Sequence, residues 1–446
     1  MRLARNVGWL AGARGLTGVL SIVYLGFASR TLGARDFGTF ALILTFGQLV
    51  ANLVQFQSVK GVIRYGVIHL DKDQSVRSAQ SARLARLFGA MATFDLLGIA
   101  AGAIIAVGAI PMVAGLFAWS GDRQVVTAAF TVALLLSNSG TPTGILRLFG
   151  RFDRLAMIEE IGPCIRVAGA FLAWLTGGEI AVFLAVWAVA ALVQSAAQWW
   201  ASLAIDGIRF EIGRRSFRKA IGENHRLWRF MLFTNLSNSL TLFWMQLGTL
   251  AVGAVAGPVQ AGGFRIAQRV AKGIGNPVEL VTRALYPEFA KMVAANRFDA
   301  LGRVLVRTTL VASALATVTV LAVALGGKWI LDVIAGAQFQ FAYWLLVLLS
   351  ISTAFDLASF ALDPYHIAQG RPGRILRTRF VGALVYLAIL ALALPRLGAS
   401  GAAYAAIAAS AAMFAQLIQS ARQIAGEAKR SAAITHGRPL PKRGEL

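Results

Sequence analysis

Polar side chains recur at helical spacing in an otherwise apolar stretch near residue 270. Six of them follow one another at intervals of three or four residues: Arg265, Arg269, Lys272, Asn276, Glu279 and Arg283. Each residue of an α-helix advances by ~100°, so these side chains fall within roughly ±40° of one line. The spacing predicts a helix with a cationic face, which suits an anionic ligand held by charge-assisted hydrogen bonds.

A structural alternative stays open at the ends of this stretch. Arg265 and Arg283 lie near opposite ends of the apolar segment, from which long side chains can reach the lipid headgroups. Glu279 precedes Arg283 by four residues and can simply pair with it. Arg269 and Lys272 lie deeper, where a charge costs at least ~2.5–3.5 kcal/mol. These two cations therefore favour a cavity-lining role.

Neutral polar residues form a second stripe in an earlier apolar segment. Gln48, Asn52 and Gln55 share one helix face and carry no charge. Arg14 and Asn238, each within an apolar segment, are further candidates for the same substrate-binding cavity. Together with the cationic face, these residues predict a polar cavity at membrane depth.

Ionisable residues at membrane depth, three acids and one arginine, are the candidates for ion coupling or gating. Glu279 and Arg283 belong to this group, as do Asp356 and Asp363. For the two aspartates, local capping and pairing with an arginine are the alternative. Asp95 is a lone acid without a partner that the sequence identifies.

Polar residues from 137 to 141 precede Pro142, which favours a role in satisfying freed backbone groups. No metal-ligand cluster is predicted, because the four histidines are far apart. They are His69, His225, His366 and His436.

Composition identifies the class of protein that carries these residues. The 446 residues are 57% hydrophobic and only 14% charged, and the net charge is +23. Stretches of ~20 apolar residues, long enough to cross a bilayer, recur along the chain. We expect an all-α integral membrane protein with twelve transmembrane helices. The predicted spans are 9–29, 38–59, 88–109, 124–146, 157–176, 179–203, 228–252, 262–284, 304–325, 342–363, 375–394 and 400–421.

The placement of the positive charge predicts the topology. With the N-terminus in the cytoplasm, the cytoplasmic loops and tails hold about 32 of the 43 Lys and Arg residues. Both termini are therefore expected in the cytoplasm of a bacterial inner membrane. The charge is a topology signal with some attraction to anionic membrane lipids, and it indicates no nucleic-acid partner.

Two stretches about half the chain apart resemble each other and predict an internal repeat. "LGARDFGTF" (32–40) and "AGPVQAGGF" (256–264) share two glycines and a phenylalanine at an offset of about 224 residues. We expect two six-helix lobes related by a pseudo-two-fold axis along the membrane normal. The predicted domains are an N-lobe at 1–203, a basic linker at 204–227, a C-lobe at 228–424 and a basic tail at 425–446.

The region after the first predicted span resembles a known transporter family. The residues "SRTLGARDFGTFAL" (29–42) and "VKGVIRYG" (59–66) resemble the oligosaccharide flippases of the multidrug/oligosaccharidyl-lipid/polysaccharide exporter superfamily. The resemblance covers essentially the whole chain. It implies two helical bundles around a central cavity that moves an undecaprenyl-pyrophosphate-linked oligosaccharide to the periplasmic leaflet.

The resemblance also implies a use for the polar residues. The cations would offset the charge of the pyrophosphate, and the neutral stripe would face sugar hydroxyls, in the assembly of O-antigen lipopolysaccharide or exopolysaccharide. A polysaccharide polymerase and a chain-length regulator are the implied protein partners. No cofactor is implied, and coupling to protons or sodium ions stays open.

Two rival functions stay open at this stage. A cation-coupled multidrug exporter shares the superfamily, but such proteins usually carry carboxylates in the N-lobe, where this first span has Arg14. A membrane polysaccharide polymerase or glycosyltransferase is less favoured, because the predicted external connections are short. We therefore expect a transporter and not an enzyme.

Overall fold

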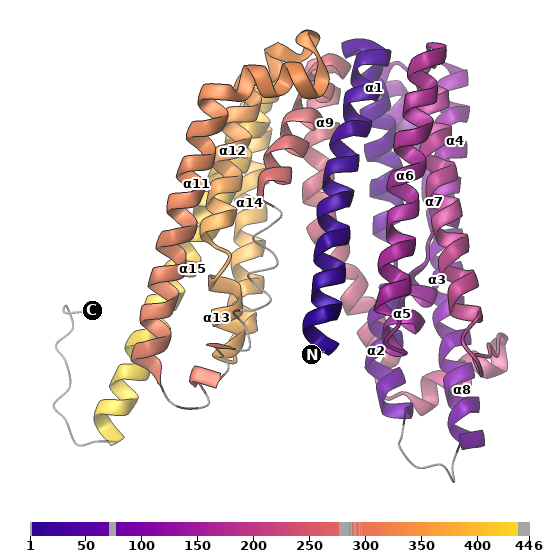
Figure 1. Cartoon of the computed structure of the whole chain (residues 1–446), viewed down its shortest axis with the longest axis vertical. Coiled ribbons are helices and arrows are strands. Elements are labelled where there is room, and N and C mark those ends of the chain that lie inside the picture. Colours follow the sequence, from indigo (N-terminus) through magenta and orange to yellow (C-terminus); the bar gives the residue numbers. More distant parts are fainter. Residues whose placement is uncertain are drawn as a thin grey trace. The chain divides into compact units, whose positions relative to one another are not determined.

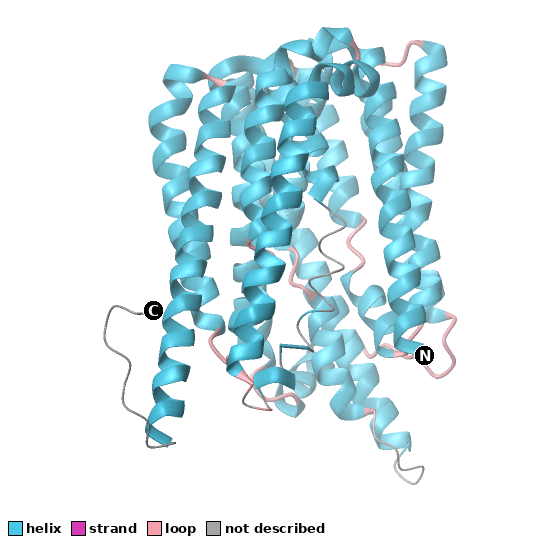
Figure 2. Ribbon diagram, turned by 60° about the vertical axis from the view of Figure 1, so that its left-hand side comes forward, coloured by secondary structure: helices cyan, strands magenta, loops and turns pink. Residues whose placement is uncertain are grey.

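The protein is helical throughout the part of the chain that the structure describes. The computed structural model describes residues 2–70, 77–275, 285, 288–289, 291–293, 295 and 297–435. None of these residues forms a strand (Figures 1 and 2). The chain forms two compact units, Met1–Gly262 and Gly263–Leu446.

Unit 1 is a bundle of long apolar helices. Its helices are α1 (Arg2–Val54), α2 (Ser58–His69), α3 (Arg77–Phe117), α4 (Gly121–Leu136), α5 (Gly140–Leu148), α6 (Phe152–Thr176), α7 (Ile180–Leu203), α8 (Arg214–Glu223) and the first part of α9 (Leu227–Gly275). Helix α1 contacts α4, α6 and α7, and these helices run alongside one another in Figure 1. Large apolar side chains such as Ile104 and Met112 are exposed, as lipid-facing residues are.

Unit 2 contains the end of α9 and the helices that follow it. These are α11 (Phe298–Ala335), the 3₁₀ helix η2 (Ala337–Ala342), α12 (Tyr343–Ala358), α13 (Leu362–Ala368), α14 (Pro372–Leu397) and α15 (Ala399–Thr435). Helix α12 contacts both α11 and α15, and α15 also contacts α14 (Figure 1). One core of this unit gathers Phe289, Leu301 and Tyr365.

The described residues include nine helices that are long and apolar enough to cross a membrane. The predicted first and second spans fall together in the stretch Gly15–His69, and parts of the seventh and eighth fall in Gln246–Gly273. The fifth span lies in α6, where Glu159, Glu160 and Arg166 reduce the hydropathy. Nine such helices are consistent with twelve predicted spans.

Gly33 and Gly257 interrupt the long helices α1 and α9 with the same backbone conformation. Their φ and ψ angles are 73° and 174° for Gly33, and 83° and 173° for Gly257. A positive φ of this size favours glycine, because a Cβ would clash with the backbone. The two kinks lie at the predicted repeat offset, so the repeat extends to backbone geometry. The predicted lobes 1–203 and 228–424 are defined by the sequence repeat. The two compact units are defined by contacts within the structure, so the limits of the lobes stay a prediction.

Gly38 and Gly262, which the repeat also aligns, lie against each other within unit 1. A Cβ added to Gly262 would lie 3.0 Å from the Gly38 Cα, and one added to Gly38 would collide with the Pro258 carbonyl. Membrane helices come this close only where small residues let the backbones meet. The repeat glycines therefore mark a crossing of α1 and α9.

Three short breaks interrupt helices that would otherwise be continuous. Helices α1 and α2 are separated at 55–57, where Gln57 has a φ of 55°. Helices α4 and α5 are separated at 137–139, within the polar run before Pro142. Helices α12 and α13 are separated at 359–361, about one repeat offset later. Each break frees backbone groups that need partners away from water.

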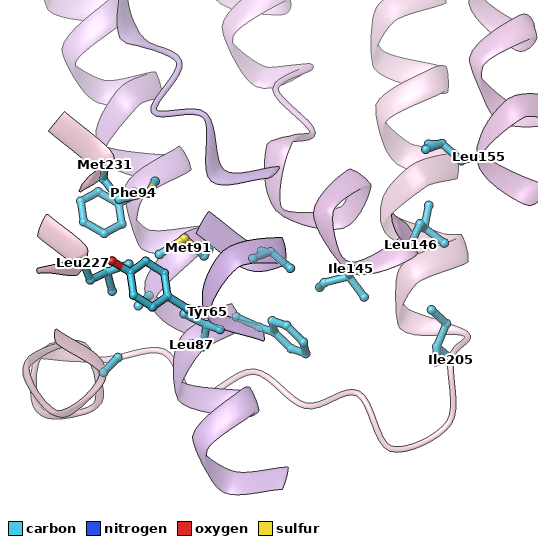
Figure 3. Packing of buried hydrophobic residues seen from close by; sticks show 14 of the residues in the cluster. Tyr65, Leu87, Met91, Phe94, Ile145, Leu146, Leu155, Ile205, Leu227 and Met231 are labelled. Atoms are coloured by element: carbon cyan, nitrogen blue, oxygen red, sulfur yellow. The ribbon is translucent and has the colours of Figure 1, made fainter. Parts of the chain in front are cut away.

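The basic linker contributes a short amphipathic helix to the core of unit 1. Phe217 of α8 packs on Phe94 of α3 with ring centroids 5.4 Å apart. Arg86 of α3 donates two hydrogen bonds to the Glu223 carboxylate, at 3.0 and 2.7 Å. Figure 3 shows the apolar cluster that includes Tyr65, Leu87, Met91, Phe94, Leu227 and Met231. The linker is thus part of the folded unit and not a free tether.

We expect Gly38→Ala to destabilise the protein, because the added methyl group meets the Pro258 carbonyl. Overpacking of this kind costs about 1–3 kcal/mol. The matched control is Gly18→Ala, which has nothing within 4 Å of the new Cβ and should gain up to ~1 kcal/mol of helix propensity. Thermal unfolding in detergent measures both. Equal midpoints for the two variants would contradict the close crossing.

Candidate functional site

A cavity of about 190 Å³ lies in unit 1 beside two of the helix breaks. The helix breaks at 55–57 and 137–139 bring side chains from the ends of α1 and α4 together. The polar residues that line the cavity are Gln48, Asn52, Gln55, Ser137, Asn138 and Ser139. We call this cavity the amide pocket. It unites the three neutral residues that the sequence predicted as one stripe.

The amides of the pocket contact one another and the neighbouring backbone. Gln55 Nε2 lies 3.5 Å from Asn138 Oδ1, which also accepts a hydrogen bond of 3.3 Å from the Gly140 backbone N–H. Gln246 Nε2 donates to Gln48 Oε1 at 3.3 Å. Each carboxamide can both donate and accept. The pocket therefore offers both kinds of hydrogen-bonding group to a ligand.

Side chains satisfy the backbone groups that the breaks release. Asn235 of α9 donates to the Gln55 carbonyl at 2.9 Å and reaches the Leu53 carbonyl at 3.4 Å. Ser137 Oγ donates to the Leu134 carbonyl at 2.7 Å. These bonds replace the lost helical ones, as the membrane interior requires.

Asp95 joins the two broken spans to α3. Its carboxylate accepts hydrogen bonds from Ser58 Oγ at 2.5 Å, from the Thr141 backbone N–H at 2.9 Å and from Thr141 Oγ1 at 2.6 Å. Asp95 is only 3% exposed. Ser58 and Thr141 lie in the first turns of α2 and α5, so the acid also lies at two helix N-termini, where the dipole favours negative charge.

Sequence reasoning noted Asp95 but did not identify these partners. The usable signal was a hydroxyl residue in the first turn of each helix after a break. The sequence does not show which helices lie against α3, so the three residues could not be connected.

The cations Arg265, Arg269 and Lys272 lie on the last turns of α9, within unit 2. The predicted helix is present as far as Gly275. Arg265 and Lys272 are half-buried, and Arg269 is exposed. The three charges are near enough to act on one another electrostatically. This segment concentrates positive charge on a helix that is otherwise apolar.

Asp356 of α12 is an acidic neighbour of this cationic segment. It interacts electrostatically with Lys272 and accepts a hydrogen bond from Ser410. Ser410 Oγ is also 3.1 Å from Ser352 Oγ. One carboxylate thus offsets part of the charge of the three cations, and the segment keeps a net positive charge.

Asp363 is placed separately, at the start of α13. Its carboxylate accepts a 2.9 Å hydrogen bond from Arg379 Nη2, and both side chains are partly exposed. Nearby, His366 is buried between the Leu362 carbonyl at 2.7 Å and Ser420 Oγ at 2.9 Å. These contacts favour the local ion pair over a coupling role for Asp363.

Five of the predicted site residues cannot be placed as side chains. Arg14 lies on α1 and Asn238 on α9, but their side chains are outside the described part of the structure. Asn276, Glu279 and Arg283 lie outside the described residues altogether. Within the described residues, no group of three or more His, Cys, Asp and Glu side chains is arranged to hold a metal ion.

Comparison with known proteins identifies the family. Residues 3–293 match the model of the family described as "Polysaccharide biosynthesis protein". The chain belongs to this family. The inner membrane protein YghQ of Escherichia coli strain K12 is 28% identical over 354 residues, which cover 77% of this chain and 95% of YghQ. The resemblance stated from the sequence is thus confirmed at the level of the family.

Solved structures identify the fold. An inward-facing multidrug resistance transporter of the MATE family, in the MOP superfamily, matches with a TM-score of 0.68 and 14% identity, covering 94% of this chain and 96% of its own. The lipid II flippase MurJ, in an inward closed conformation, matches with a TM-score of 0.68 and 11% identity. The match covers 95% of this chain and 90% of the MurJ chain. The predicted all-α, two-lobed membrane fold is confirmed. At these identities the likeness concerns the fold alone.

We expect Asp95→Ala to destabilise the protein strongly, because it leaves the buried Thr141 N–H without its acceptor. A hydrogen bond to a charged group contributes about 1.5–3 kcal/mol. Asp95→Asn, which keeps one acceptor oxygen, should lose less. The control is Asp153→Ala, an exposed acid at the start of α6. The midpoints of thermal unfolding in detergent measure the stability of each variant. An unchanged midpoint for Asp95→Ala would show that the hydrogen bonds of Asp95 are dispensable for stability.

Proposed function

We propose that this family member translocates an undecaprenyl-pyrophosphate-linked oligosaccharide across the bacterial inner membrane, for lipopolysaccharide or exopolysaccharide assembly. The protein is a multi-pass membrane protein with a transporter fold, and the polysaccharide family supplies the substrate class. We place both termini in the cytoplasm, following the distribution of Lys and Arg. A polymerase and a chain-length regulator are the proposed partners.

The observation that carries this proposal is the cationic segment of α9. Arg265, Arg269 and Lys272 lie together in a helix that composition assigns to the membrane, and Asp356 is their acidic neighbour. Each charge at membrane depth costs at least ~2.5–3.5 kcal/mol. A pyrophosphate headgroup would offset that cost through charge-assisted hydrogen bonds, which are roughly twice as strong as neutral ones.

The multidrug exporter is the rival function, and the MATE-like fold fits it equally. An organic cation would be attracted by carboxylates and repelled by the α9 segment. Asp356 is the acid that such a substrate would use, but it already faces Lys272. The surplus of cations favours an anionic substrate.

The first test is complementation of a flippase-deficient bacterium, scored as surface polysaccharide. We expect Arg269→Ala and Lys272→Ala each to lower polymer at least tenfold, with Arg269→Lys retaining part of it, because the charge persists without the planar fork of donors. The control is Arg396→Ala, an exposed arginine at the end of α14. Membrane levels are measured by immunoblot. Normal polymer from both alanine variants at normal levels would refute the role of the cations.

A second experiment separates the flippase from the exporter. Asp356→Asn removes the negative charge beside Lys272 and keeps the shape of the side chain, so a flippase should bind its anionic headgroup at least as tightly. An exporter would lose its acid and its drug resistance. Polymer yield and drug sensitivity are scored in the same strains. Loss of resistance with no polymer phenotype would support the exporter.

A further inference from the structure

We propose that the amide pocket of unit 1 binds one neutral sugar ring of the transported molecule. This proposal rests on the proposed function and adds the recognition of the uncharged part of the substrate. The cationic segment of α9 would bind only the headgroup, and a headgroup alone does not distinguish one lipid-linked sugar from another.

The chemistry of the lining favours an uncharged, hydroxyl-rich ligand. The residues that line the pocket include three hydroxyl or amide side chains from 137–139, two amides from α1 and one, Gln55, from the break after it, and none of the lining residues carries a charge. Carboxamides and hydroxyls can both donate and accept, as sugar hydroxyls do. The other lining residues, such as Ile99 and Leu135, offer an apolar wall for the C–H face of a ring. A charged ring would find no counter-ion in the lining.

The size of the pocket limits the ligand to a single ring. Its volume of about 190 Å³ corresponds to roughly six water molecules at ~30 Å³ each. Pockets for drug-sized molecules have ~300–1,000 Å³. The pocket has space for about one sugar ring, and the other rings of an oligosaccharide would lie outside it.

The pocket is held in shape before a ligand arrives. Asp95 fixes the starts of α2 and α5 through Ser58 and Thr141, directly after the two breaks that border the pocket. Asn138 is oriented by the Gly140 N–H. A site whose polar groups are already ordered loses less conformational entropy on binding. Its weak 3.5 Å contact between Gln55 and Asn138 is one that a sugar hydroxyl can replace at little cost.

The internal repeat gives an independent argument for a neutral site. At the repeat offset the sequence aligns Thr45 with Arg269, Gln48 with Lys272, Asn52 with Asn276 and Gln55 with Glu279. The first copy is neutral at each of these positions, whereas the second carries charge at three of them. A ligand with one anionic part and one uncharged polar part matches this division.

A small cavity among the described residues of unit 2 has a different lining from the amide pocket. It measures about 10 Å³ and is lined by small and hydroxyl residues such as Ala271, Ser350 and Thr353, with no amide among its lining residues.

The test uses the full-length protein in lipid nanodiscs and three probes. These are undecaprenyl pyrophosphate, the same lipid bearing one neutral hexose, and the same lipid bearing one hexuronic acid. We expect the wild-type protein to bind the hexose-bearing lipid about tenfold more tightly than the bare lipid, as two net hydrogen bonds would give. The hexuronic acid probe should gain less than twofold.

Two variants assign that gain to the pocket. Asn52→Leu and Gln55→Leu should reduce the hexose gain to within about twofold and leave the affinity for the bare lipid unchanged. The control is Gln198→Leu, the same change at a buried glutamine of α7 outside the pocket, which should keep the full gain. Where a leucine variant also loses the bare lipid, Asn52→Ala and Gln55→Ala are judged by the same criterion.

The outcomes separate this proposal from the proposed function. Equal wild-type affinity for the bare and hexose-bearing lipids would overturn the sugar site and leave the flippase function standing. A hexose gain that survives both substitutions would also overturn it. Failure of the wild-type protein to bind any of the three lipids would overturn the proposed function and the sugar site together.

Discussion

The membrane interior supplies no water to a backbone group that has left its helix, and unit 1 depends on how this constraint is met. Breaks at 55–57 and 137–139 release N–H and carbonyl groups in spans that composition places in the bilayer. Asp95 connects the two breaks, because one buried carboxylate accepts from the Ser58 hydroxyl and from the Thr141 backbone N–H. This acid supports the helix starts after both breaks, and the amide pocket lies beside these breaks.

The same constraint explains why the polar residues at membrane depth are not equivalent. Asp95, Ser137 and Asn235 each make a hydrogen bond to a backbone N–H or carbonyl group beside a break. These bonds replace helical hydrogen bonds that the breaks remove. The cations of α9 have no such task, since the helix continues past them to Gly275. Within the described residues their cost is not offset by any repair of the backbone, which agrees with the ligand-binding role that we propose for Arg269 and Lys272.

Prediction from sequence succeeded for the properties that depend on one helix at a time. Apolar length defined the membrane class, and helical periodicity grouped Gln48, Asn52 and Gln55, which all line the amide pocket. The glycine motif indicated the repeat, and the matching conformations of Gly33 and Gly257 support it.

Prediction failed for the contacts that depend on which helices lie next to each other. The partners of Asp95 come from two helices far apart in sequence, and periodicity within α3 carries no information about them. The contribution of Asn138 to the pocket was missed for a related reason. The polar residues before Pro142 were interpreted as partners for freed backbone groups, and Ser137 has this role. The same break also places the Asn138 side chain against Gln55.

The two copies of the repeat agree and differ at different kinds of position. They agree at Gly33 and Gly257, where a positive φ excludes other residues, and at Gly38 and Gly262, where the backbones touch. They differ along the polar stripe, where no backbone requirement applies and Gln48 aligns with Lys272. Geometry holds the glycines fixed in both copies, whereas the stripe is free to follow the ligand. A substrate with a charged part and an uncharged part can therefore be served by one fold used twice, because only the side chains that do not build the fold need to change.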